Sequence, residues 1–278
     1  MDRYKLLCED CGYSIEGLED ESKCPECGTS VASSLPAARP GTLWQHKSSL
    51  TNWCRTNWNA LRHPKHMFRT MKIDKGSSNS LLAINILIAS FFIADPWVGV
   101  LIFDPARGAR LQGPVIEVAM QGGMLLFWMC VTSLFLLGLT WIECRGVRFF
   151  SNRRGWRMTP EAAWQICCHA SIGWIIMALL PLLGMAAMVA LVRVFHYSPT
   201  GVIDLTRWLG PGAPTWHVEA VVRNTLTLGA GLAGLMVFES LVYIGARQCK
   251  YAATIPASHP ASAHSDGQTR GTASATES

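Results

Sequence analysis

Charged residues are scarce in this chain. Asp, Glu, Lys and Arg make up 15% of its 278 residues, whereas hydrophobic residues make up 50%. Soluble domains carry about 25% charged residues, so the composition excludes an ordinary soluble protein and predicts a membrane protein with modest polar appendages. The formal net charge of +5 is too small to indicate a nucleic-acid-binding protein by itself.

A secretory signal and the common catalytic motifs are also missing. Residues 1–20 are polar and acidic and contain no apolar core segment, so we expect no signal peptide and a cytoplasmic N-terminus. The chain has no G-x-S-x-G, no H-E-x-x-H and no glycine loop for phosphate. His196 and His217 are isolated histidines, which are more often surface residues than catalysts. We therefore expect no enzymatic activity.

The chain does contain long runs of uncharged residues. The most prominent is Val118–Ile142, with 25 residues between Glu117 and Glu143. A helix of this length exceeds the roughly 30 Å hydrocarbon core of a bilayer, so it can span a membrane. Basic residues follow directly, namely Arg145, Arg148, Arg153, Arg154 and Arg157. The positive-inside rule places this end of the helix in the cytoplasm.

Three further spans are expected around it. The first begins at Leu81 and is broken by Asp95, where the helix either leaves the bilayer or carries an intramembrane acid. The third follows Thr159, which can cap a helix whose first position is Pro160. The last lies between Arg223 and Arg247. The predicted fold is an all-α domain of four transmembrane helices over residues 76–251, in the cell (inner) membrane, with both termini cytoplasmic. A disordered tail is expected over 252–278.

The last span contains an acid and a row of small residues. Gly229-xxx-Ala233 and Ala230-xxx-Gly234 have the spacing that lets helices approach closely, and this face could also join two copies of the chain in a homo-oligomer. We expect Glu239 to be neutralised by Arg247 or His169. The alternative is a transport function, with polar groups at Asp95, Glu117, Gln121 and Glu239.

Two cysteine pairs near the N-terminus form the most specific motif. Cys8 and Cys11 make a C-x2-C pair followed by Gly12, and the same pattern returns twelve residues later at Cys24, Cys27 and Gly28. Two thiolates on one tight turn can bind the same cation, and a following glycine allows the positive φ that the turn needs. Residues 1–28 are therefore predicted to fold around a tetrahedral zinc site with Cys8, Cys11, Cys24 and Cys27 as ligands.

This N-terminal segment resembles the zinc ribbons that precede many bacterial membrane proteins of unknown role. The resemblance rests on Cys8, Cys11, Gly12, Tyr13, Gly17, Cys24, Pro25, Cys27 and Gly28. The same residues are similar to the rubredoxin-type iron site of rubrerythrin-like proteins, which implies iron and electron transfer as an alternative. The chain lacks the Glu-x-x-His pairs of a di-iron bundle and any flavin or haem signature.

Two segments connect the ribbon to the spans. Residues 29–42 are small, polar and Pro-rich, and are expected to be a linker without a core. Residues 43–75 carry seven basic residues against Asp74, interleaved with aromatic residues. Leu50, Trp53, Cys54, Trp58 and Leu61 share one helical face, and Pro64 interrupts the helix. Such a segment is expected to lie in the membrane interface and to bind anionic lipid rather than nucleic acid.

Five further cysteines are expected on or near the cytoplasmic side, where no disulfide forms, namely Cys54, Cys144, Cys167, Cys168 and Cys249. Four of them could approach a histidine and create a second metal or redox site, but small apolar packing is the expected use of each. The group consists of Cys144, Cys167, Cys168, Cys249 and His169.

The membrane part, from about Leu61 to Tyr251, resembles the Yip-type multi-pass family. The similarity rests on Leu61–Phe68, on Ala163–Trp174 and on the closing Gly245-Ala-Arg247. That family usually has five spans, whereas four are predicted here, and the Asp-Leu-Tyr-Gly-Pro signature of its eukaryotic members is missing. The resemblance implies a non-enzymatic integral membrane protein, and we expect an adaptor or scaffold that recruits a protein partner through the ribbon.

Overall fold

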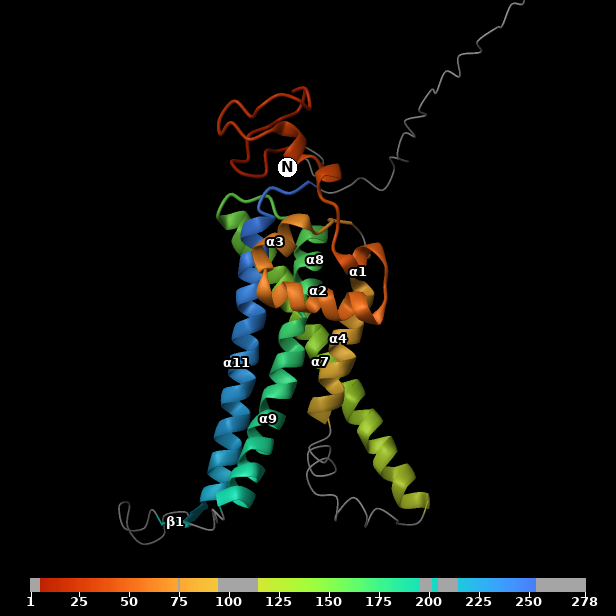
Figure 1. Ribbon diagram of the computed structural model, residues 1–278, viewed down its shortest axis with the longest axis vertical. Helices are drawn as coiled ribbons and strands as arrows, with labels where there is room; N and C mark the ends of the chain where they lie inside the picture. The colour runs from red at the N-terminus through yellow and green to blue at the C-terminus, as the bar shows by residue number, and fades with distance from the viewer. Residues whose placement is uncertain (1–5, 75, 95–114, 196–201, 205–214, 254–278) are drawn as a thin grey trace, which may run out of the picture.

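Helices make up nearly all of the regular structure. The computed structural model describes residues 6–74, 76–94, 115–195, 202–204 and 215–253 (Figure 1). Its long helices are α4 (Asn79–Ala94), α7 (Val115–Arg153), α9 (Ile172–Phe195) and α11 (Val218–Gln248), and its shorter ones are η1 (Val31–Ser34), η2 (Pro36–Ala38), α1 (Leu43–His46), α2 (Leu50–Arg62), α3 (Pro64–Thr70) and α8 (Pro160–Ala170). Two antiparallel strands, β1 (Val202–Asp204) and β2 (Thr215–His217), pair Ile203 with Trp216.

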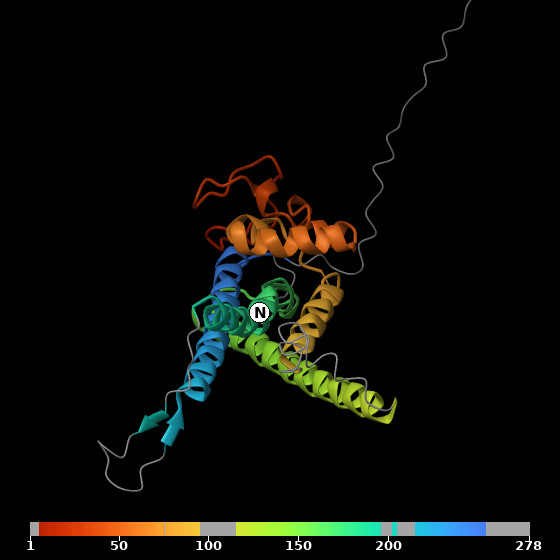
Figure 2. The same cartoon turned by 60° about the horizontal axis from the view of Figure 1, so that its bottom comes forward.

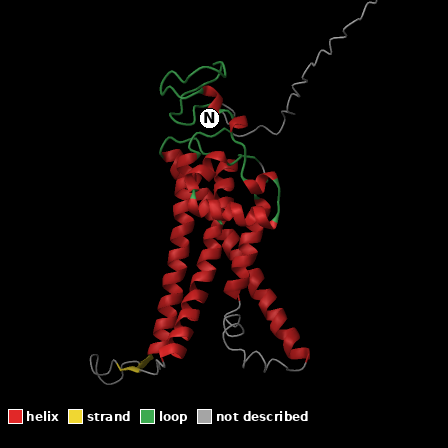
Figure 3. Cartoon of the chain, viewed as in Figure 1, coloured by secondary structure: helices red, strands yellow, loops and turns green. Residues whose placement is uncertain are grey.

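The long helices form a bundle with the N-terminal segment at one end (Figures 1 and 3). The same end holds the last turn of α11, the start of α4 and the short helices α1, α2, α3 and α8. Figure 2 shows α2 crossing this end of the bundle at a large angle to the long helices. The N-terminal and C-terminal parts of the described chain are therefore brought to one side of the molecule.

Among the residues that the structure describes, three helical stretches are long and apolar enough to cross a membrane. They are Gly122–Arg153, Pro160–Gly184 and Leu228–Gln248. The predicted first span is represented by α4, a shorter apolar helix of 16 residues. Asp95 and the rest of that span lie outside the described residues, so a fourth crossing stays a prediction.

Helix α7 exposes a broad apolar surface. Its most exposed large apolar side chains are Met124, Leu126, Phe127, Leu134, Phe135 and Phe150. Burying such side chains contributes about 1.5–3 kcal/mol each, so water is a poor solvent for this helix. An apolar surface of this extent is what a lipid-facing helix presents.

Helices α9 and α11 pack closely because glycine is present at their contacts. A Cβ on Gly173 would lie 2.6 Å from Phe238 Cβ, and one on Gly234 would overlap the backbone of Met177. The Trp174 and Phe238 rings stack with their centroids 4.3 Å apart. The close approach expected for the last span is therefore made at Gly234, whereas a Cβ on Gly229 would meet no atom within 4 Å.

The predicted helix starts follow from capping residues. The Thr159 hydroxyl accepts from the Ala162 N–H at 3.2 Å and Pro160 is the first residue of α8, which confirms that prediction. Helix α2 ends at Arg62 and α3 begins at Pro64, which confirms the interruption.

Helix α2 is held against the bundle by its polar side. Asn85, in the middle of apolar α4, is fully buried. Its Oδ1 accepts from Trp53 Nε1 at 2.8 Å, and its Nδ2 donates to Asn57 Oδ1 at 3.1 Å and to Ser171 Oγ at 2.8 Å. Of the apolar face expected to enter the membrane interface, Leu50 and Trp58 point outward, at 78% and 59% exposed, whereas Trp53 of the same face packs against the core.

Candidate metal centre

The N-terminal segment consists of two copies of one turn. In the first, Gly12 N–H donates to Cys8 O and Cys8 N–H donates to Tyr13 O, at 2.9 and 2.8 Å. In the second, Gly28 N–H donates to Cys24 O at 2.9 Å, and Cys24 N–H donates to Thr29 O at 2.8 Å. Gly12 and Gly28 have φ of 81° and 74°, a conformation that disfavours any residue with a Cβ. The glycine after each C-x2-C pair therefore supplies the positive φ that the sequence pattern predicts for each turn.

The two turns direct all four sulfurs to one point. The Sγ atoms of Cys8, Cys11, Cys24 and Cys27 lie within 4.8 Å of one another. Cys8 Sγ is 3.5 Å from Cys27 Sγ, and Cys11 Sγ is 3.6 Å from Cys24 Sγ. A zinc ion with bonds of about 2.3 Å needs sulfurs roughly 3.8 Å apart at the corners of a tetrahedron. The predicted ligands therefore form a group that could hold a metal ion.

The thiols differ in their readiness to lose a proton. Burial raises the pKa of Cys11 to about 12, and hydrogen bonds to the neighbouring thiols add to this. Contacts of the Cys27 sulfur with the hydroxyl and N–H of Thr29 lower the pKa of Cys27 to about 6. Metal ligands bind as thiolates, so Cys27 is the ligand best prepared for a cation. A four-thiolate site leaves no coordination position open, which is typical of structural rather than catalytic metal sites.

The ribbon extends beyond the predicted limit at residue 28. Ile15 and Val31 are both 2% exposed and pack with Cys8 and Cys24 in a small core. Their N–H groups make matching bonds of 3.0 Å, Ile15 to Leu6 O and Val31 to Ser22 O. The signal was in the sequence, because CEDCGYSI (8–15) and CPECGTSV (24–31) align residue by residue. Since this repeat ends at Val31, we use "the ribbon" below for residues 6–31.

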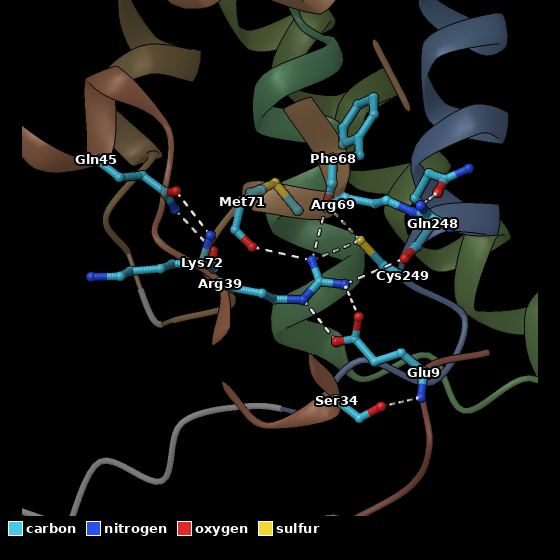
Figure 4. A network of polar contacts seen from close by, with 10 residues as sticks. All are labelled: Glu9, Ser34, Arg39, Gln45, Phe68, Arg69, Met71, Lys72, Gln248 and Cys249. Carbon is cyan, nitrogen blue, oxygen red and sulfur yellow. Dashed lines mark hydrogen bonds and ion pairs between the residues drawn. The ribbon is translucent and has the colours of Figure 1, made fainter. Parts of the chain in front are cut away.

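Arg39 connects the ribbon to the helix bundle (Figure 4). Its Nε and Nη2 donate to the Glu9 carboxylate at 2.8 and 3.1 Å. The other donors bind main-chain carbonyls, with Nη1 2.9 Å from Phe68 O and 3.2 Å from Met71 O, and Nη2 3.3 Å from Gln248 O. Arg39 is 2% exposed, although it belongs to the stretch 29–42 that was expected to be a linker without a core. In the structure this stretch holds the ribbon against α3 and α11.

Three further contacts support the same interface. A Cβ on Gly12 would lie 2.8 Å from the Tyr251 ring, so the first turn of the ribbon sits directly on the segment after α11. The N–H of Glu9 donates to Ser34 Oγ at 3.1 Å. On the bundle side, Thr42 Oγ1 lies 3.2 Å from His169 Nε2. No pattern in the sequence pointed to Arg39, because a single arginine in a Pro-rich stretch does not reveal its partners.

The other sulfur groups do not form a second metal site among the described residues. The Cys144 and Cys167 thiols hydrogen-bond each other, whereas Cys249 Sγ donates to Phe68 O at 3.5 Å and accepts from Arg39. His169 binds Thr42 and Gln165 O. These side chains are used in separate contacts, as expected for packing residues.

The acid in the last span does not have the expected partners. His169 binds Thr42 and Gln165 O instead. No ion pair from Glu239 to Arg247 is found within the described part of the chain. Instead, Glu239 and Glu143 line one cavity of about 220 Å³ between α7 and α11. The side chains of Glu117 and Gln121, the other groups considered for transport, lie outside the described residues.

Comparisons with known proteins do not extend this picture. No family model matches the chain, and neither the search of curated proteins nor that of solved structures finds a match. The resemblance to the Yip-type family is therefore not confirmed. The group of four cysteines and the apolar helices stand on the structure alone.

Proposed function

We propose that this chain is a non-enzymatic membrane protein that carries a zinc-bound ribbon on its cytoplasmic side and recruits a protein partner through it. The observation that carries the proposal is the rigid position of the ribbon. Its four-cysteine group folds the turns, and the Glu9–Arg39 contacts hold them on one end of the bundle. A module fixed in this way presents the same face to the surroundings at all times.

The membrane part of the proposal is supported by the exposed apolar surfaces. Helix α7 exposes apolar side chains between Met124 and Phe150, and α2 presents Leu50 and Trp58 outward beside the exposed cations Arg55 and Arg62. An amphipathic helix of this kind binds at the level of the lipid headgroups, where anionic lipid attracts its cations. The arginines in the last turns of α7 and directly after it favour the cytoplasmic side for this end. Labelling Cys54, an exposed thiol outside the four-cysteine group, in intact and in permeabilised cells after the other exposed cysteine outside the group, Cys130, is replaced by Ser tests the orientation, and labelling of Cys54 in intact cells would overturn it.

The outer face of the ribbon is acidic, which specifies the chemistry of the partner. Exposed acids gather on the loop between the two turns and on the second turn, beside the exposed Leu18 and Tyr13, namely Glu16, Glu19, Asp20, Glu21 and Glu26. A basic protein segment complements such a surface. We therefore expect capture of basic partners that depends on these carboxylates.

Metal analysis and capture by the full-length protein test the two halves of the proposal. The purified protein should contain one zinc ion per chain, lost in Cys24→Ser and retained in Cys54→Ser, whose exposed thiol lies outside the cluster. Capture of partners should fall in Cys24→Ser and in Glu19→Gln/Glu21→Gln, but not in Cys54→Ser. Equal capture by all variants would contradict the adaptor. Iron in place of zinc would favour the electron carrier.

One observation favours a second candidate, a component of a proton or cation transporter. Glu143 and Glu239 line the same cavity within the candidate membrane spans, and acids at this depth are typical of ion pathways. The test is ion flux in proteoliposomes. Glu239→Gln should abolish flux in a transporter, while zinc content and folding are retained; no flux in the native protein would exclude this candidate.

A further inference from the structure

A cleft of about 540 Å³ lies between the ribbon and the cytoplasm-proximal ends of α3 and α11. One wall is formed by the ribbon and η1, and includes Glu9 and Ser34. The opposite wall is formed by the exposed side of α3 and by the last turn of α11. Because the Arg39 contacts fix the ribbon in place, the cleft is part of the folded structure and does not depend on a chance approach of two loose segments.

Four cations line this cleft. Lys65 and Arg69 lie one turn apart on α3, Arg247 lies in the last turn of α11, and Lys250 lies two residues after the end of α11. The two acids of the lining are already engaged, since the Glu9 carboxylate binds Arg39 and Asp10 Oδ2 accepts from the Thr29 hydroxyl at 2.9 Å. Asp10 keeps its charge, but the four cations outnumber the two acids of the lining, so the cleft is positively charged, with cations contributed by α3, by α11 and by the segment that follows α11.

Two of the cations are positioned by neighbouring groups. Arg69 Nε donates to Gln248 Oε1 at 2.9 Å (Figure 4), which orients the guanidinium and leaves its Nη groups for another acceptor. Lys250 Nζ lies 5.4 Å from the centroid of the Tyr251 ring. Arginine donors in a fixed fork match the oxygens of a phosphate group better than a flexible charge does.

A third part of the cleft lining is apolar. It contains Trp156, Tyr243 and Ile244, and Trp156 and Tyr243 also line the neighbouring cavity of about 220 Å³ between α7 and α11. A ligand with a charged head and an apolar tail could therefore pass from the cations into the space between two candidate membrane helices. Glu143 and Glu239 line that neighbouring cavity and not the cleft, so a negative group is favoured at the cation end.

We propose that this cleft binds the phosphate group of an anionic phospholipid, with Arg69 and Arg247 as the main contacts and the acyl chains along Trp156 and Tyr243. Basic pockets at the cytoplasmic ends of membrane helices are suited to such headgroups. This site goes beyond the proposed function, because lipid binding here requires neither zinc nor a protein partner. A soluble phosphate ester has the same head chemistry without the tail, and the experiment separates the two sources.

The test uses the full-length protein in neutral detergent, with native mass spectrometry to count bound lipid. Phosphatidylglycerol should bind with one tight site per chain, and phosphatidylcholine at least about tenfold more weakly. Arg69→Gln/Arg247→Gln should weaken phosphatidylglycerol binding about tenfold or more. Arg145→Gln/Arg153→Gln removes the same charge from exposed positions of α7 outside the cleft, and should change the affinity less than about twofold.

Two readouts decide the remaining outcomes. Zinc content and melting temperature show whether the cleft variant is folded, and they also separate failure of this site from failure of the proposed metal centre. Glycerol phosphate should bind far more weakly than the lipid; binding as tight as the lipid would assign the phosphate site to a soluble ester. Equal loss in both double variants, or equal binding of the two lipids, would overturn the proposal.

Discussion

Arg39 and Glu9 meet in a two-point ion pair between the helix bundle and the ribbon, with Nε 2.8 Å from Oε1 and Nη2 3.1 Å from Oε2. The Arg39 side chain is 3% exposed and that of Glu9 20%. Exposed ion pairs contribute little to stability, but a buried guanidinium that loses its acceptors is costly. Together with Phe68 O, Met71 O and Gln248 O, the carboxylate gives every Arg39 N–H an acceptor.

Substitution of Arg39 should detach the ribbon from the bundle. Arg39→Lys keeps the charge but cannot reach all of these acceptors, so we expect a loss of about 1–3 kcal/mol and faster proteolysis within residues 29–42. Thermal unfolding and limited proteolysis of the full-length protein measure both effects. Arg55→Lys is the control, because Arg55 is exposed on α2. Similar proteolysis of the two variants would contradict the role of Arg39.

The equivalent glycines of the two turns provide a matched pair. Both have positive φ, so Gly12→Ala and Gly28→Ala should each cost about 1–2 kcal/mol in the ribbon. Only Gly12 faces another residue, the Tyr251 ring, whereas a Cβ on Gly28 meets nothing within 4 Å. Gly12→Ala should therefore be the more damaging variant, and this excess should shrink in a Tyr251→Ala background. A double-mutant cycle on melting temperature measures it, and an unchanged excess would exclude the contact.

A second pair of glycines tests how α11 is used. Gly234→Leu should destabilise the bundle by about 1–3 kcal/mol or more, because the side chain would overlap the Met177 backbone. Gly229→Leu should have little effect on the fold of a single chain. If the small-residue face joins two copies, Gly229→Leu should instead shift the oligomer to monomer in size-exclusion chromatography with light scattering. A monomeric native protein would exclude that assembly.

Acid should release the metal before the bundle unfolds. Metal binding requires thiolates, and a proton competes for each sulfur as the pH falls. The pKa of Cys27 is lowered to about 6, so this thiol is largely deprotonated at neutral pH. The pKa of Cys11 is raised to about 12, so this thiol must lose its proton when the metal binds. We therefore expect affinity to fall by more than about tenfold between pH 7.5 and 5.5. Competition with a chromogenic chelator measures this, and a pH-independent affinity would contradict a thiolate site.

Several features of this protein followed from the sequence because their causes are local. The C-x2-C-G turns require only neighbouring residues, and Thr159-Pro160 carries its own start signal for α8. The sequence also predicts apolar helices long enough to span a membrane, since the length and mean hydropathy of a helix depend on the residues of one segment alone. Even the extent of the ribbon was available, through the repeat that places Val31 opposite Ile15.

The tertiary structure alone decided which residues act together. Arg39 and Asn85 have no local pattern that announces their partners, and each bonds groups from several helices. The cleft beside Arg69 and Arg247 exists only because α3 and α11 meet under the ribbon. The physical reason is that a motif is fixed by short-range backbone geometry, whereas a buried charge or a cleft depends on how distant segments pack. The sequence determined a thiolate turn repeat and apolar helices; packing decided that the ribbon is held in place and where cations converge.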